Sequence, residues 1–199
     1  GECVKNLEEM LAPINKEMMA NNGAVAKKRP PVDRWVLQSQ AHCGEINIYI
    51  DARGKWFHEG DPINRQPLVK LFASILWHDN STGISQYFLI TPAEKLQIKV
   101  DDTPFIAVLS DVLDSQWQVI TNLDEKVVIG EQHPVELRMY KGQWLPYVRI
   151  RYDLWARVSR AVYEQWINAA LDGQGGDDET VPATLTLASK DYLFDVATA

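Results

Sequence analysis

The chain has 199 residues, of which 46% are apolar and 24% are charged. This is the composition of an ordinary globular protein, and a chain of this length buries enough apolar surface to fold as one or two compact units. The formal net charge of -7 gives no overall field that would attract nucleic acid. No apolar run approaches the roughly 20 residues that span a bilayer. We therefore expect neither nucleic acid nor a membrane among the partners.

The two cysteines, Cys3 and Cys43, form no CxxC pair and are too few for a disulfide framework. There is no signal-peptide pattern, so the cytoplasm is the expected compartment. Sequence motifs of phosphate loops, nucleophile elbows and zinc proteases are absent as well. We expect no metal and no cofactor.

Residues 1–30 are predicted to form an N-terminal helix and a linker. Apolar residues recur at spacings of three and four, which is typical of one face of a helix: Val4, Leu7, Leu11, Ile14 and Met18. The polar, proline-containing stretch from Asn21 to Pro31 follows. The helix either packs on its own domain or forms a homodimer seam with a second copy.

Residues 31–104 are predicted to be a first α+β unit. Ile46, Ile48 and Ile50 alternate with polar residues, which indicates a half-buried strand that turns at Gly54 and returns to Glu59. A helix is expected from Pro67, ending at Asn80 to Gly83. Strands are expected at 87–90 and 96–100.

Residues 105–199 are predicted to hold bridging strands and a second α+β unit. The bridging strands are 105–109, 117–121 and 126–129, and a hairpin follows at 135–152. A helix is expected with Asp153 as its N-cap and Gly173 at its end. Strands at 185–187 and 192–194 close the chain.

The two hairpins share a Gly-x-Trp pattern. Gly54 and Trp56 precede Gly142 and Trp144 by 88 residues each (142 − 54 and 144 − 56). We therefore predict two ββαββ units, at 44–101 and 134–197. The expected fold class is α+β, with two tandem ββαββ-like units joined by short bridging strands, plus the N-terminal helix.

Three arginines are the predicted ligand-binding residues. Arg149 and Arg151 alternate along one strand and should share a face with Tyr147, while Val148 and Ile150 should face the core. Arg65 precedes a helix N-terminus, where backbone N–H groups favour anions. Together they suggest a small anionic ligand held by guanidinium groups. The alternative is a solvated sheet face with ordinary ion pairs.

The first hairpin also carries residue types used in catalysis. Cys43 lies beside His42. His58, Glu59 and Asp61 could supply metal ligands with Asp51, but only two of them share a strand face, so no metal site is expected. A thiolate next to a histidine can act as a nucleophile, yet sequence neighbours in a strand point to opposite faces. We predict that Cys43 is buried and unreactive, and the catalytic residues are unknown.

The chain also carries a series of short motifs: Cys43-Gly44-Glu45-Ile46, Arg53 to Gly60, Pro62-Ile63 with Arg65, Leu68-Val69-Lys70-Leu71-Phe72-Ala73, Thr91-Pro92 with Glu94-Lys95, Val100 to Phe105, Thr121-Asn122, His133-Pro134 and Pro146 to Arg149. On these motifs, the stretch from Pro31 onwards resembles a proteobacterial family of domains of unknown function. The resemblance implies two related α+β units in tandem and a signalling or regulatory role, and it offers no catalytic residues. Where that family often has Arg-Asp-Gly at the hairpin turn, this chain has Asp51-Ala52-Arg53-Gly54.

These observations favour a small-ligand-binding or regulatory module over an enzyme. The alternatives are an enzyme that uses Cys43 or the His58 and Glu59 pair, and a protein-interaction scaffold. Nucleophile–base contact in a pocket would favour the enzyme, and converging arginines would favour the binding module.

Overall fold

The computed structural model describes residues 7, 9–12, 29–38, 42–174 and 180–198. The chain divides into two compact units, Gly1–Asp102 and Thr103–Ala199. Each contains a six-stranded sheet and few helices, so the fold is broadly α+β. Among the described residues, none forms a helix long and apolar enough to cross a membrane.

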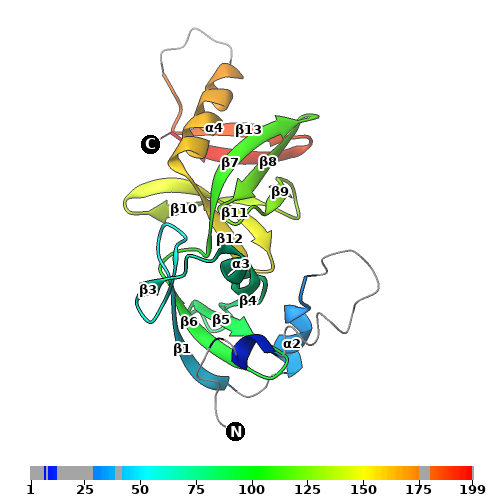
Figure 1. Ribbon diagram of the computed structural model, residues 1–199. Coiled ribbons are helices and arrows are strands. Elements are labelled where there is room, and N and C mark those ends of the chain that lie inside the picture. Colours follow the sequence, from blue (N-terminus) through cyan, green and yellow to red (C-terminus); the bar gives the residue numbers. More distant parts are fainter. Residues whose placement is uncertain (1–6, 8, 13–28, 39–41, 175–179, 199) are drawn as a thin grey trace. The chain divides into compact units, whose positions relative to one another are not determined.

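The first unit is built on a mixed sheet (Figure 1). Its elements are α2 (Val32–Gln38), β1 (His42–Ile50), β2 (Trp56–His58), β3 (Asp61–Pro62), α3 (Gln66–Ser74), β4 (Leu76–Asp79), β5 (Gln86–Ile90) and β6 (Lys95–Val100). The strand order is β3-β2-β1-β6-β5-β4. β1 and β6 are parallel, and the other neighbours are antiparallel.

The core of the first unit follows from the alternation of β1. Ile48 and Ile50 are buried, and α3 adds Phe72, whose ring stacks on Trp56 with 6.3 Å between centroids. Each such side chain taken out of water contributes roughly 1.5–3 kcal/mol. Pro67 lies in the first turn of α3, as predicted.

The second unit has a sheet of six strands and a separate pair. Its elements are β7 (Phe105–Leu113), β8 (Gln116–Thr121), β9 (Lys126–Val128), β10 (Val135–Tyr140), β11 (Gln143–Arg151), β12 (Leu154–Val158), α4 (Arg160–Asp172), β13 (Thr184–Ser189) and β14 (Tyr192–Ala197). The order is β10-β11-β12-β7-β8-β9, and β13 pairs with β14. Buried Trp166 of α4 meets Trp117 and Phe194 edge-on, so α4 joins the sheet to the β13–β14 pair.

The two six-stranded sheets have the same topology. Taken from the equivalent edge, β9-β8-β7-β12-β11-β10 repeats β3-β2-β1-β6-β5-β4. The parallel pair β7 and β12 occupies the place of β1 and β6, again between antiparallel neighbours. The two copies of the internal repeat in this chain are therefore residues 42–100 and residues 105–158.

The predicted repeat of 44–101 and 134–197 is not supported. β5 and β6 return to the sheet of β1, whereas β13 and β14 form a sheet of their own. The two Gly-x-Trp turns also differ in length. In the first hairpin, residues 51–55 connect the paired residues Ile50 and Trp56, and the Gly54 N–H donates to the Asp51 carbonyl. In the second hairpin, only Lys141 and Gly142 connect the paired residues Tyr140 and Gln143. Trp56 is 2% exposed and Trp144 is 47% exposed, so the tryptophans of the two matching motifs have different environments.

Two predicted helix boundaries are wrong, because residues predicted to be helical pair instead with neighbouring strands of the sheets. Residues 154–158 form β12 between β11 and β7, and α4 begins after Ser159, not Asp153. Residues 76–79 form β4 against β5, so α3 ends at Ser74, well before Asn80.

Helix α2 was not predicted. Residues 7 and 9–12 are helical, and the other positions of the predicted N-terminal stripe lie outside the described residues.

Ser159 is the N-cap of α4, and its side-chain oxygen accepts a hydrogen bond from Val162 N–H at 3.3 Å. Ser159→Ala should lower the free energy of unfolding by about 1 kcal/mol, and Ser159→Asn should restore most of the loss, because asparagine is an equally good N-cap. Urea denaturation measures both. Equal stability of the alanine variant and the parent would show that the cap contributes nothing.

Candidate functional site

A hollow of about 640 Å³ lies in the first unit along β1, β5 and β6. This volume is within the range of small-molecule sites, about 300–1,000 Å³. Most of the residues that line it are polar, and they include Glu45, Asn47, Gln86, Gln97, Lys99 and Asp101. A site with this lining suits a polar ligand.

The hollow lies where β1 and β6 pair unevenly. Glu45 pairs with Gln97 and Tyr49 pairs with Lys99, so four steps along β1 face two along β6. Extra residues of this kind bulge a strand away from its neighbour. Gly44, at the start of the irregular stretch, has φ 105°, a conformation that side chains with Cβ rarely adopt. The bulged residues 45–48 form one side of the hollow.

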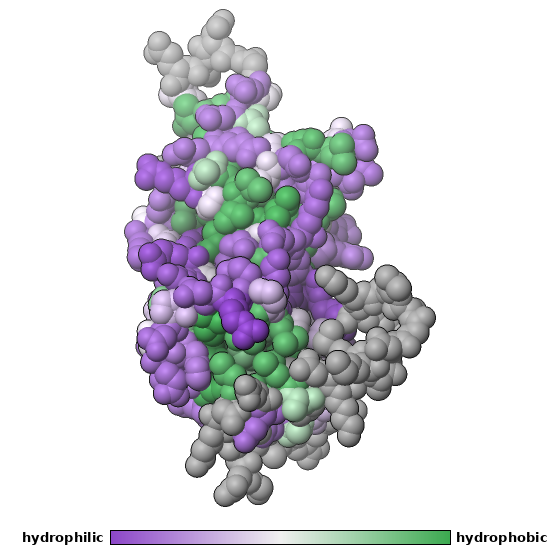
Figure 2. Space-filling model, viewed as in Figure 1, coloured by the Kyte–Doolittle hydropathy of each residue, from purple (hydrophilic) through white to green (hydrophobic). Residues whose placement is uncertain are grey.

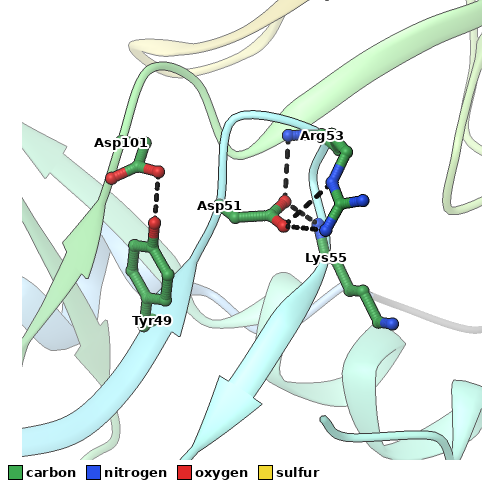
Figure 3. A network of polar contacts seen from close by, with 5 residues as sticks. All are labelled: Tyr49, Asp51, Arg53, Lys55 and Asp101. Carbon is green, nitrogen blue, oxygen red and sulfur yellow. Dashed lines mark hydrogen bonds and ion pairs between the residues drawn. The ribbon is translucent and has the colours of Figure 1, made fainter. Parts of the chain in front are cut away.

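A polar network continues from the hollow to the end of β1 (Figure 3). The Tyr49 hydroxyl donates a short hydrogen bond to Asp101, a lining residue. Beyond it, Asp51 Oδ1 accepts the backbone N–H groups of Arg53 and Lys55, both at 2.9 Å. Asp51 Oδ2 accepts the Arg53 guanidinium at 3.0 and 3.2 Å. Asp51 thereby closes the first hairpin.

In this network the pKa of Asp51 is lowered and the pKa of Tyr49 is raised. Burial raises the pKa of Asp51, but the backbone N–H of Lys55 and the groups of Arg53 outweigh it and hold the pKa below its ordinary 3.8. The hydrogen bond to Asp101 raises the pKa of Tyr49, because it stabilises the protonated phenol. Tyr49 is thus a hydrogen-bond donor at neutral pH, with Asp101 as its acceptor.

Cations and aromatic rings alternate beside the network. The rings of Tyr49 and Phe57 stack at 5.7 Å, Lys99 Nζ lies 5.6 Å from the Tyr49 ring centre, and Lys55 Nζ lies 5.8 Å from that of Phe57. Such contacts contribute about 0.5–1 kcal/mol at exposed sites. They restrict Lys99, the cation of the hollow.

A serine and a histidine meet at the hollow. Ser85, which lines it, has its Oγ 2.7 Å from His78 Nε2. The His78 ring stacks almost parallel on Tyr87, with 4.2 Å between centroids and 6° between planes. The sequence predicted a helix that runs from Pro67 to Asn80 and so includes His78, and the pair was missed because the contact depends on the register of β4 with β5.

The predicted arginines occupy separate environments. Arg65, in the first unit, is exposed at the N-cap of α3. In the second unit the Arg149 guanidinium donates to the Gln132 carbonyl at 2.9 and 3.3 Å, and Arg151 forms an ion pair with Glu125. Val148 and Ile150 are buried, as the alternation predicts. Arg149 and Arg151 therefore already hold acceptors within the chain, and the anion site stays a prediction.

The other candidate residues are not drawn together. His58 Nε2 is 3.9 Å from Glu59 Oε1 in a partly exposed pair. His42 and Cys43 belong to β1, but their side chains lie outside the described part of the chain, so the burial of Cys43 stays a prediction. Within the described residues, no group of three or more His, Cys, Asp or Glu side chains could hold a metal ion.

Fold and site define a tandem α+β protein with a duplicated six-stranded sheet, in which the first copy contains a polar hollow. Family models match both copies: the N-terminal domain of the DUF1285 family, a domain of unknown function, over residues 30–103, and its C-terminal domain over residues 104–196. The chain belongs to the DUF1285 family.

Two solved structures are similar. A DUF1285 family protein from Silicibacter pomeroyi DSS-3 has 29% sequence identity and a TM-score of 0.71, over 87% of this chain and 90% of that one. A DUF1285 family protein from Shewanella baltica OS155 has 28% identity and a TM-score of 0.49, over 61% of this chain and 90% of that one. A comparison with curated proteins found no match.

The lowered pKa of Asp51 predicts a pH-dependent contribution to stability. Because ionised Asp51 is favoured in the folded state, its contribution is present above the ordinary value of 3.8 and is lost as pH falls through the lowered pKa. Asp51→Asn should cost roughly 0.5–1 kcal/mol at pH 7, since the Arg53 side chain is exposed and screened. Urea denaturation of both proteins from pH 7 downwards should show the difference shrinking below about pH 4. A constant difference would contradict this assignment.

The ion pair of Arg151 and Glu125 is mostly buried, with side chains 10% and 17% exposed. Arg151→Met should lower the free energy of unfolding by roughly 3–5 kcal/mol, because it leaves a carboxylate without its cation. Adding Glu125→Gln should recover part of that loss, which chemical denaturation of the single and double variants measures. Additive losses would show that the pair is not coupled.

Proposed function

We propose that this protein is a small-ligand-binding module with a regulatory role, and that its ligand occupies the hollow of the first unit. The observation that carries the proposal is the hollow itself: about 640 Å³, bounded by a bulged strand and lined by polar groups. A site for a small molecule needs concavity and a few fixed polar groups, and both are present.

The lining supports a polar metabolite as the ligand. Amide side chains donate and accept, Lys99 binds acceptors, and Glu45 and Asp101 bind donors. The stacked rings beside Lys99 and the Tyr49 hydrogen bond restrict two of these groups before any ligand arrives. Restriction of this kind reduces the entropy lost on binding.

The predicted anion at Arg65, Arg149 and Arg151 is a second ligand class. What favours it is Arg65, which is exposed at the N-cap of the nine-residue helix α3 and whose side chain makes no capping hydrogen bond. Phosphate-bearing metabolites belong in the same binding screen, and unchanged binding of every hit by Arg65→Ala and Arg149→Ala would reject this class. A homodimer through the N-terminal helix also stays a proposal, for which light scattering of a variant lacking residues 1–30 is the test.

A thermal-shift screen with polar metabolites should find a ligand that raises the melting temperature, because binding to the folded state alone stabilises it by about 2.7 kcal/mol at one hundred times Kd. Lys99→Met should then weaken binding about ten- to a hundred-fold, measured by calorimetry, since a charged hydrogen-bond partner contributes roughly 1.5–3 kcal/mol. Gln97→Leu should weaken it less.

Lys126→Met is the matched control, because Lys126 is an exposed lysine of β9 in the second unit. Its affinity should equal that of the parent protein. Hits that bind all three variants equally would place the ligand outside the hollow and reject the proposal.

A further inference from the structure

We propose that Ser85 and His78 form a nucleophile–base pair that hydrolyses a small ester or thioester held in the hollow. This rests on the proposed function, since the substrate would be the ligand of that site. The contact that carries it is Ser85 Oγ to His78 Nε2, at 2.7 Å, with Ser85 in the lining of the hollow. A weak hydroxyl nucleophile needs a base within hydrogen-bond reach, about 2.6–3.2 Å, and this pair meets that requirement.

Two independent contacts orient the base. β4 and β5 place His78 opposite Tyr87, and the nearly parallel stacking of the rings restricts rotation of the imidazole. The hydrogen bond to Ser85 holds Nε2 beside a residue that lines the hollow. When Nε2 carries no proton, Ser85 Oγ–H donates to it, which is the arrangement that removes the hydroxyl proton during attack.

The hollow also contains groups that would stabilise the reaction's negative charge. An attacked carbonyl develops an oxyanion, and amide N–H groups or a cation nearby lower its energy. Gln97 and Lys99 of β6 belong to the same lining as Ser85. These two residues are the donors of β6 that the lining of the hollow offers to a substrate carbonyl.

The steps balance without any further reactant except water. Ser85 Oγ forms a bond to the acyl carbon while its proton passes to His78 Nε2. The bond from the acyl carbon to the alcohol or thiol then breaks, and the leaving group takes that proton. Water attacks the acyl-serine, gives a proton to His78, and releases the acid as Ser85 regains its hydrogen.

A neighbouring serine provides a matched comparison. Ser81, in the same β4–β5 connection, donates its hydroxyl to Asp79 Oδ1 at 2.6 Å. Hydrogen bonds from Ser81 lower the pKa of Asp79, so this carboxylate is a weak base. Ser81 and Ser85 are both exposed, but only Ser85 has an imidazole partner among the contacts described here.

The test is covalent labelling of the full chain with a fluorophosphonate probe, followed by peptide mapping. The adduct should form on Ser85 and be absent from Ser85→Ala. His78→Gln, which retains a hydrogen-bond partner but takes up no proton, should slow labelling at least a hundred-fold, in line with the contribution of general-base catalysis. Ser81→Ala should label at the parent rate. Hydrolysis of p-nitrophenyl acetate should follow the same order.

Several outcomes would overturn the proposal. They are the absence of an adduct on Ser85, equal labelling of Ser81 and Ser85, and an unchanged rate in His78→Gln. Because loss of the ring stack could destabilise His78→Gln, circular dichroism melting is recorded for each variant, and Ser85→Ala, which keeps the stack, tests hydrolysis independently. If labelling fails while unreactive polar ligands still bind in a Lys99-dependent manner, the catalytic proposal is wrong and the binding function stands.

Discussion

The parallel pairing at the centre of each six-stranded sheet is the constraint on which the fold depends. β1 pairs with β6, and β7 pairs with β12. Parallel neighbours cannot be joined by a tight turn. The chain therefore needs a long crossover between the two central strands, and in both units this crossover supplies the outer strands of the sheet, β2 to β5 and β8 to β11. One topological requirement, met twice, accounts for most of both units.

The two copies differ in what covers their central strands. In the second copy α4 packs against β7, where Trp166 Nε1 donates to Ser110 Oγ at 2.9 Å and Gln165 donates to the Ser110 carbonyl at 3.0 Å. In the first copy β1 is bulged and forms the wall of a hollow. Figure 2 shows polar residues over much of the visible surface, with apolar groups in patches between them. The volume and lining of the hollow, rather than an exposed apolar patch, therefore make the first copy the candidate for ligand binding.

Local pattern was a good guide wherever a segment has one buried face. The alternation of Ile48 and Ile50 predicted β1, and that of Val148 and Ile150 predicted the buried face of β11. It failed at residues 76–79 and 154–158, where apolar residues adjoin a helix and fit its period equally well. Only the hydrogen bonds to β5, β7 and β11 distinguish strand from helix there. The repeat was placed wrongly for the same reason, since Gly-x-Trp is a local pattern and the true repeat is a pattern of pairings.

The sequence by itself determined the α+β class, the strands with clear alternation, and the family resemblance, because each depends on residues close together in the chain. The tertiary structure alone decided the sheet order, the bulge that opens the hollow, and the meeting of His78 with Ser85. These depend on register: His78 lies opposite Tyr87, and Glu45 lies opposite Gln97. Register comes from the packing of whole strands against one another, and a shift of one residue would turn each of these side chains to the other face.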